Sequence, residues 1–186
     1  MNLIKKFLLF LFISLLLTSC AVPAIKRLSA QEEMLKTYGG YNSYLALEYL
    51  RFSLSLLAVE DKKTSEYFAE KWLKVAEGAD VIPENPMRWK ADPEQVDGMI
   101  AMQKRLEMPL MTPHMKFYLP IQLAHLSYLY DCWISRESKA IFRADELAQC
   151  RVRFTKLLGE IETYIDDLGK DKTPRVEIRE PEFELF

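Results

Sequence analysis

The chain has 186 residues, of which 25 are Lys or Arg and 27 are Asp or Glu, and its formal net charge is −2. This length suits one modest hydrophobic core, so we expect a single folded domain. Domains that bind nucleic acid usually carry a clustered excess of Lys and Arg, and this charge balance therefore argues against a nucleic-acid partner.

The first twenty residues have the three parts of a secretory signal in order. Lys5 and Lys6 form a basic start, an apolar run extends from Phe7 to Leu17, and small residues lead to Cys20. The stretch Leu17-Thr18-Ser19-Cys20 resembles the lipobox of bacterial lipoproteins. The resemblance implies cleavage before Cys20, a diacylglycerol on its sulfur, and fatty acyl groups such as palmitate at the mature N-terminus.

Several acyl chains would hold the mature protein on a membrane permanently. The residue after Cys20 is Ala21 rather than aspartate, which resembles lipoproteins that are forwarded to the outer membrane. We therefore expect a lipid-anchored protein on the periplasmic face of the bacterial outer membrane. Loss of Lys5 and Lys6 with the signal leaves 23 basic residues against 27 acidic ones, a formal charge of −4.

An uncleaved membrane helix is the alternative for the same segment. Extended to Ile25, the apolar run approaches the ~20 residues that a bilayer requires. Pro23 and the polar residues at the proposed cleavage site weaken such a helix. Basic pairs lie on both sides of the run, so the charges indicate no orientation.

Residues 20–40 are expected to form a tether with some helical content, because Gly39-Gly40 would end a short helix over residues 29–37. From Asn42 to Glu60, apolar residues cover most of the helical circumference, which predicts a helix inside a bundle. After a tight junction at 61–63, apolar residues at three- and four-residue spacing predict a second helix that ends at Gly78. The two helices would form an αα-hairpin.

The segment from Ala79 to Pro93 holds three prolines, which excludes a continuous helix. We expect a packed loop there that Trp89 anchors onto the bundle. At its end, Asp92-Pro93-Glu94 is typical of a helix start, with an N-cap, a proline in the first turn and an acid near the positive helix end. A short third helix through Glu107 is expected, with Met108-Pro109 stopping it.

Thr112-Pro113 opens a predicted fourth helix that runs through about Trp133, with a possible kink at Pro120. Its apolar positions include Phe117. The fifth predicted helix has the clearest pattern, because apolar residues from Leu147 to Leu168 recur in a strict three-four alternation. No strand-like alternation of comparable length competes with these helices.

The expected architecture is all-α: a single helical bundle of about five helices, built on αα-hairpins, over residues 41–168. A lipoprotein signal peptide (1–19) and a lipid-anchored tether (20–40) precede it, and a short polar tail (169–186) follows. Apolar residues alternate within the tail, so an edge strand or partner-binding strand is the alternative to an exposed, charged tail.

Cys132 near the end of the fourth helix and Cys150 in the first turns of the fifth are the two cysteines besides Cys20. Two antiparallel helices would bring both sulfurs to similar heights, and an even pair in an exported chain indicates a disulfide. Two buried free thiols are the alternative, which failure of export would favour. A redox-active pair is disfavoured, because the C-x-x-C spacing is absent.

Several short motifs occur in a particular order along residues 41–158. They are Tyr44-Leu45-Ala46-Leu47-Glu48-Tyr49-Leu50, then Glu66-Tyr67-Phe68-Ala69-Glu70-Lys71, then Gly78 with Val81, Pro83-Glu84 and Trp89, then Tyr130-Asp131-Cys132-Trp133, and Cys150-Arg151-Val152-Arg153-Phe154. In this order they resemble the helical N-terminal region of OmpA-family lipoproteins of Gram-negative bacteria. In that family a peptidoglycan-binding α/β domain follows. We expect this chain to lack it, so none of that domain's binding residues can be carried over.

Candidate catalytic residues are few. His114 and His125 are eleven positions apart, about 16 Å along a helix at ~1.5 Å per residue, too far to share one metal, and each is expected to be a surface or capping residue. The adjacent acids Asp166-Asp167 and Glu32-Glu33 would diverge on helices. No phosphate-binding loop or nucleophile elbow occurs. We expect no enzyme activity, no cofactor and no metal site.

These observations favour a non-enzymatic, lipid-anchored helical module that scaffolds or binds a protein partner in the cell envelope. Attachment to peptidoglycan through an unrecognised site is the alternative. An envelope hydrolase is disfavoured, because the sequence shows no nucleophile and base in a recognisable arrangement.

Overall fold

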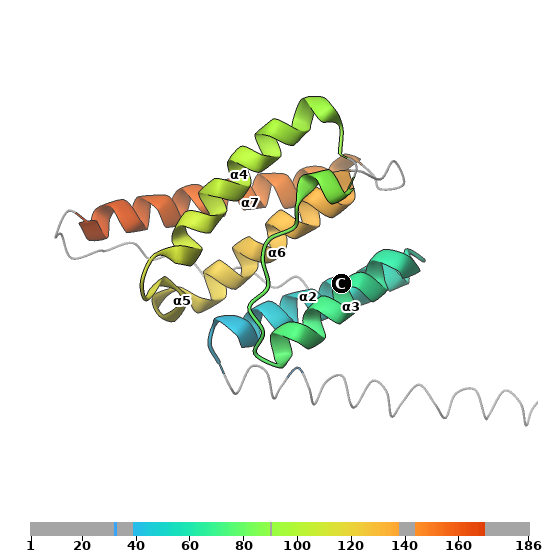
Figure 1. The fold of residues 1–186 in the computed structure, drawn as a ribbon, viewed down its shortest axis with the longest axis horizontal. Helices are drawn as coiled ribbons and strands as arrows, with labels where there is room; N and C mark the ends of the chain where they lie inside the picture. The colour runs from blue at the N-terminus through green and yellow to red at the C-terminus, as the bar shows by residue number, and fades with distance from the viewer. Residues whose placement is uncertain (1–31, 33–38, 90, 138–143, 170–186) are drawn as a thin grey trace, which may run out of the picture. The chain divides into compact units, whose positions relative to one another are not determined.

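The computed structural model describes residues 32, 39–89, 91–137 and 144–169, and within these ranges it is entirely helical (Figure 1). The elements are α2 (Tyr41–Ala58), α3 (Lys62–Ala76), the 3-10 turn η1 (Pro86–Trp89), α4 (Pro93–Met111), α5 (Met115–Tyr118), α6 (Pro120–Glu137) and α7 (Ala144–Gly169). The predicted all-α class is confirmed. The predicted signal peptide, Cys20, nearly all of the tether and residues 170–186 of the tail lie outside the described ranges.

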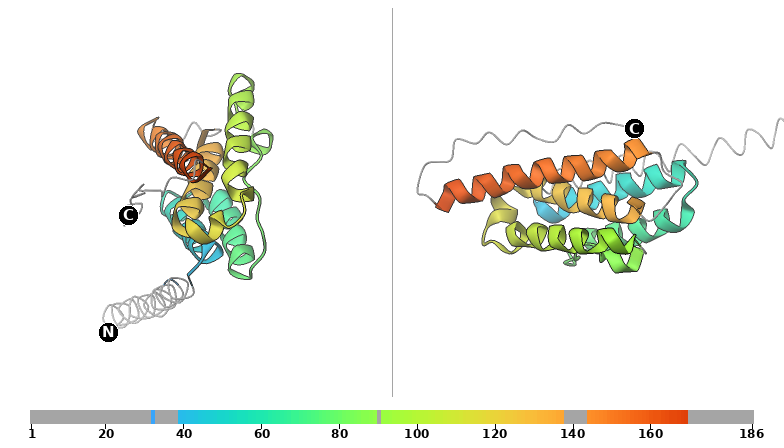
Figure 2. Two further views of the ribbon diagram at one scale, coloured as in Figure 1. Left: turned by 90° about the vertical axis from the view of Figure 1, so that its left-hand side faces the viewer. Right: turned by 90° about the horizontal axis from the view of Figure 1, so that it is seen from above.

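Helix α6 is the centre of the bundle. It packs against α2, α4, α5, α7 and η1. The α2–α3 hairpin lies on one side of α6 and α7 on another, while α4 crosses α6 and α7 (Figures 1 and 2). Side chains on every face of α6 between Leu123 and Ser135 are buried, as expected for a helix that is covered all round.

Local sequence explains where the hairpin helices begin and end. The Asp61 carboxylate accepts a hydrogen bond from the Thr64 N–H at 3.3 Å and caps α3. Gly78, with φ 88°, then closes α3. The N–H groups of Gly78 and Ala79 return to the carbonyls of Val75 and Lys74 at 3.0 and 2.9 Å. This pattern needs a left-handed residue, which glycine adopts at little cost.

The predicted stop at Met108-Pro109 is wrong, because α4 continues through Pro109 to Met111. Pro109 lies in the last turns of the helix, where its missing N–H removes one hydrogen bond while its ring gains burial in the core. The helix ends instead at Thr112, whose hydroxyl donates to the Met108 carbonyl at 2.8 Å.

The predicted fourth helix is divided into two. Leu119 has φ −126° and ψ 51°, outside the helical region, because the ring of Pro120 disfavours a helical conformation in the residue before it. The break changes which residues face the core: Met115 and Leu119 are buried, whereas Phe117 is 80% exposed. Phe117, one of the apolar positions of the predicted fourth helix, therefore lies on the surface.

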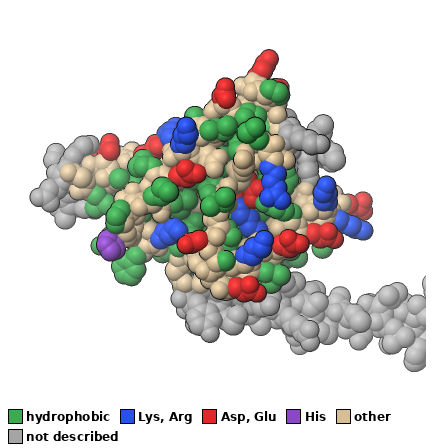
Figure 3. Space-filling model, viewed as in Figure 1, with side chains coloured by type: hydrophobic (Ala, Val, Ile, Leu, Met, Phe, Trp, Pro, Cys, Tyr) green, Lys and Arg blue, Asp and Glu red, His purple; other side chains and the backbone are tan. Residues whose placement is uncertain are grey.

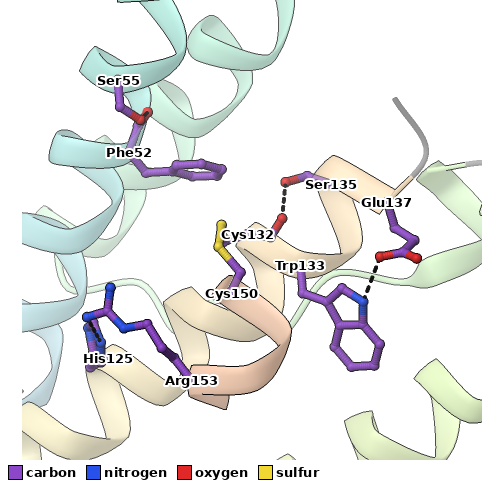
Figure 4. Close-up of a disulfide and its surroundings, with 9 residues drawn as sticks. All are labelled: Phe52, Ser55, His125, Cys132, Trp133, Ser135, Glu137, Cys150 and Arg153. Atoms are coloured by element: carbon purple, nitrogen blue, oxygen red, sulfur yellow. Dashed lines mark hydrogen bonds between the residues drawn. A yellow bond between two sulfur atoms is a disulfide. The ribbon is translucent and has the colours of Figure 1, made fainter. Parts of the chain in front are cut away.

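Cys132 and Cys150 form a disulfide that joins α6 to α7, as predicted (Figure 4). The sulfur–sulfur distance is 2.03 Å and the Cα atoms are 6.1 Å apart. Both cysteines are buried, and the Ser135 hydroxyl donates to the Cys132 carbonyl at 3.2 Å. Within the described ranges, no helix combines the length and apolar character needed to span a bilayer.

Removing the disulfide should destabilise the domain without changing its helix content. The bond closes a loop with a sequence separation of 18 residues. Replacing both cysteines by alanine should lower the free energy of unfolding by about 3 kcal/mol, from the loop entropy regained by the unfolded chain. Urea denaturation followed by circular dichroism measures this loss. Dithiothreitol should shift the wild type similarly and leave the double variant unchanged; an unshifted wild type would contradict the prediction.

Candidate functional site

A lysine buried between two carboxylates is the most distinctive arrangement of charged groups in the described domain. Lys71 Nζ, on α3, lies 2.5 Å from Asp131 Oδ2 on α6 and 2.6 Å from Glu84 Oε1 in the segment before η1. The side chains of Lys71, Asp131 and Glu84 are 8%, 0% and 4% exposed. Lys71 also donates to the Ile82 carbonyl at 3.1 Å, so its three N–H donors have three acceptors.

Both carboxylates accept further hydrogen bonds. Asp131 Oδ2 accepts from the Tyr49 hydroxyl at 2.6 Å, and Asp131 Oδ1 accepts from the Glu84 backbone N–H at 2.8 Å. Glu84 Oε1 accepts from the Tyr67 hydroxyl at 2.8 Å, and Glu84 Oε2 accepts from Trp89 Nε1 at 2.8 Å. We call these six residues, Lys71, Glu84, Asp131, Tyr49, Tyr67 and Trp89, the buried charge cluster. Every oxygen of its carboxylates is hydrogen-bonded.

Burial disfavours the charged form of each ionisable group in the cluster, whereas the ion pairs favour it. Burial alone would lower the pKa of Lys71, but the carboxylates of Asp131 and Glu84 raise it above its ordinary value. Burial would raise the pKa of Glu84, yet Lys71 and the hydrogen bonds to Glu84 hold it below its ordinary value. For Asp131, burial and the charge of Glu84 raise the pKa against the attraction of Lys71. Because the two carboxylates share one ammonium group, the negative charge on Asp131 is less favoured than the charge on Glu84.

Aromatic rings enclose the cluster. Trp89 stacks on Phe68 with ring centroids 6.0 Å apart and planes 11° apart, and it meets the Tyr67 ring edge-on at 5.4 Å. Lys71 Nζ lies 5.0 Å from the centroid of the Tyr49 ring. The predicted role of Trp89 as the anchor of the loop is confirmed, since its ring packs on the hairpin and its N–H bonds to Glu84.

A second buried polar group connects α2, α6 and α7. His125 Nδ1 lies 2.7 Å from Glu48 Oε1, and His125 Nε2 lies 3.3 Å from Arg153 Nη2 (Figure 4). An arginine only donates, so Nε2 must accept, and Nδ1 then carries the proton donated to Glu48. His125 is 5% exposed. The prediction that it is a surface or capping residue is wrong, because α6 is buried all round.

The other predicted site residues are dispersed. His114 is exposed at the N-cap position of α5, where its side chain makes no capping hydrogen bond. Asp166 and Asp167 lie near the end of α7, while Cys20 and Glu33 fall outside the described ranges. Among the residues that the structure describes, no group of three His, Cys, Asp or Glu could hold a metal ion.

The residues of the buried charge cluster carry a signal in the sequence that the search for catalytic motifs overlooks. Asp131 is the only acidic residue between Met108 and Arg136, and it lies on a helix that is otherwise mostly apolar. Lys71 occupies the same helical face as Phe68 and Val75, at spacings of three and four residues. A charge on an apolar face must find a partner when that face is buried. Such residues are therefore candidates for a buried ion pair.

Replacing Lys71 with methionine should strongly destabilise the domain. The substitution keeps most of the side-chain volume but leaves two buried carboxylates without their cation, which typically costs about 3–5 kcal/mol. Arg105→Gln is the matched control, since Arg105 Nη2 bonds Glu162 at 2.6 Å on the surface, and loss of such an exposed pair costs less than about 1 kcal/mol. Chemical denaturation measures both variants; similar losses would contradict the cluster's role.

Alkaline pH should unfold the domain through its buried tyrosines. Burial raises the pKa of Tyr41 and Tyr128 to about 12, and it also raises the pKa values of Tyr49, Tyr67 and Tyr130. Above pH ~10 the unfolded chain therefore binds fewer protons than the folded chain, so the free energy of unfolding falls as pH rises. Phenolate absorbance at 295 nm and helical circular dichroism should change together. Ionisation of all nine tyrosines near pH 10 with intact helices would contradict this.

Comparison with known proteins adds no relative: neither a protein-family model nor a curated protein or solved structure matches the chain. The resemblance to the helical region of OmpA-family lipoproteins stays a prediction based on the motifs quoted above. Four of those five motifs together supply all six residues of the buried charge cluster.

Proposed function

We propose that this protein is a lipid-anchored lipoprotein of the bacterial cell envelope whose helical domain scaffolds or binds a protein partner without catalysing a reaction. The disulfide between Cys132 and Cys150 is the observation that carries this proposal. Disulfides persist in oxidising compartments such as the periplasm. The first residues, up to Cys20, resemble a lipoprotein signal. The signal-like segment and the disulfide therefore both support a location in the periplasm.

The use of the polar groups supports a binding rather than a catalytic role. Lys71, Glu84 and Asp131 are the charged residues whose environment most resembles that of an active site. All three are buried, and each is hydrogen-bonded to other groups of the domain. Asp131 also accepts a hydrogen bond from the Glu84 backbone N–H, so these charged groups hold segments of the domain together. We therefore assign binding of a partner to the surface of the domain.

The proposed location is the periplasmic face of the outer membrane. Ala21 after the lipidated cysteine supports forwarding from the inner membrane. Between Cys20 and the start of α2 at Tyr41, the chain has enough residues to act as a tether. A domain held in this way can reach proteins next to the membrane at high effective concentration.

The mass of the full chain, produced in a Gram-negative bacterium and purified from membranes, tests this proposal. We expect a chain that begins at Cys20 and carries acyl groups, with two further thiols that react with an alkylating reagent only after reduction. A Cys20→Ser variant should leave the membrane fraction. A full-length mass with free thiols would overturn both the location and the lipid anchor.

Cosedimentation with purified peptidoglycan separates scaffolding from cell-wall attachment. Under our proposal the Cys20→Ser protein stays in the supernatant, because no surface of its helical domain is assigned to the cell wall. If it sediments with the cell wall, peptidoglycan attachment replaces protein scaffolding as the function. An equally charged, unrelated periplasmic protein is the control for nonspecific sedimentation.

A further inference from the structure

Large apolar side chains are exposed where α4 turns into α5. Their exposed fractions are 45% for Met108, 79% for Met111, 80% for Phe117 and 59% for Tyr118. We call these four residues, with Lys116 and His114, the α4–α5 tip. The rings of Phe117 and Tyr118 contact each other edge-on with centroids 5.6 Å apart. Hydrophobic side chains gather beside a histidine at the left edge of the space-filling view (Figure 3). Clustered exposed apolar groups mark contact surfaces.

Local hydrogen bonds hold the tip in one shape. The Thr112 hydroxyl closes the end of α4 on the Met108 carbonyl, and the Met115 N–H returns to the Thr112 carbonyl at 3.2 Å. His114 has φ 65°, an unfavourable conformation for a residue with a side chain, and it directs the chain back into α5. Met115 is 4% exposed and packs beneath the turn. The hydrogen bonds and the backbone of this turn therefore hold the apolar side chains on the surface.

The charge of this region is unlike that of the rest of the chain. No Asp or Glu occurs between Met108 and Tyr130, although the chain has 27 acidic residues in 186. Lys116 is the one lysine of the tip, and His114 lies beside it. Lys116 Nζ is 3.5 Å from Asp80 Oδ1, and both side chains are substantially exposed, so this pair contributes little. Glu107 precedes Met108 and Asp80 lies beside Lys116, so the border of the tip carries both signs of charge. The exposed apolar side chains, with amphipathic Tyr118 and Lys116 beside them, suit the boundary between headgroups and acyl chains of a phospholipid bilayer.

The tip lies where the tether enters the domain. Lys116 Nζ is 4.7 Å from the centroid of the Tyr41 ring, and Tyr41 is the first residue of α2. The chain from Cys20 to Tyr41 cannot span more than about 75 Å, at ~3.6 Å per residue. A lipid on Cys20 would therefore keep the tip within reach of the membrane that holds the lipid.

We propose that the α4–α5 tip is a second membrane contact, which inserts into the phospholipid surface to which Cys20 is anchored. This inference rests on the lipid anchor of the proposed function. Phe117 and Met111 enter the boundary between headgroups and acyl chains. Tyr118 and Lys116 remain among the headgroups, where amphipathic rings and phosphate-pairing ammonium groups are favoured. Because the tether makes this contact intramolecular, a weak insertion is enough to orient the domain.

Photocrosslinking in the full lipidated chain tests the inference. The protein carries p-benzoylphenylalanine in place of Phe117 and is reconstituted in vesicles of phosphatidylethanolamine and phosphatidylglycerol. The matched control places the same probe at Leu57, which is 50% exposed and lies about 24 Å along α2 from Tyr41, at ~1.5 Å per residue. We expect the mass of one phospholipid to be added at least about tenfold more often at 117 than at 57, given the steep depth dependence of interfacial insertion.

A second variant tests whether the apolar side chains of the tip are needed for the contact with lipid. With the probe in place of Tyr118, the substitutions Phe117→Glu and Met111→Glu should abolish most of the lipid adduct, and circular dichroism checks that the exposed substitutions leave the fold intact. Equal adducts at 117 and 57, or adducts at 117 with protein alone, would overturn the inference. The intact mass of the same sample separates the two failures: an acylated protein without a lipid adduct loses only this contact, whereas a protein without acyl groups loses the lipid anchor and this inference together.

Discussion

The burial of one ammonium group between two carboxylates is the constraint on which the rest of the domain depends. Lys71 cannot be placed in the interior unless Asp131 and Glu84 are placed there with it, because an unpaired charge in that position would cost several kcal/mol. Three separate parts of the chain, α3, the segment before η1 and α6, must therefore meet at one point. Trp89 and Tyr67 complete the arrangement, so the proline-rich loop is held in one position on the hairpin.

Helix α6 is the element through which the polar links pass. Asp131 connects it to α3, His125 connects it to Glu48 on α2, and Cys132 connects it covalently to α7. Each link fixes both the rotation and the height of a neighbouring helix, which apolar packing alone specifies less sharply. A few directional contacts thereby determine how the helices of the interior are arranged.

The sequence predicts the helices well where periodicity dominates and less well where neighbours decide. The α2–α3 hairpin and its end at Gly78 follow from local patterns, and so does the start of α4 at Asp92. Local pattern alone ends α4 at Pro109, but burial of the proline ring outweighs one lost hydrogen bond. The pattern also counts Phe117 among the apolar positions of one long helix, whereas Pro120 separates its short helix from α6 and leaves Phe117 exposed. The cysteine pairing is predictable because two antiparallel helices bring Cys132 and Cys150 to similar heights.

The sequence by itself determined the helical class, the pairing of Cys132 with Cys150, and the expectation of a lipid at Cys20, because each depends on local spacing or on residue type. Only the tertiary structure decided that Lys71, Glu84 and Asp131 form one cluster and that the apolar side chains of the α4–α5 tip are exposed. The reason is that both depend on how helices distant in sequence are rotated against one another. A helical pattern shows which residues share a face, but the packed bundle decides which faces are covered.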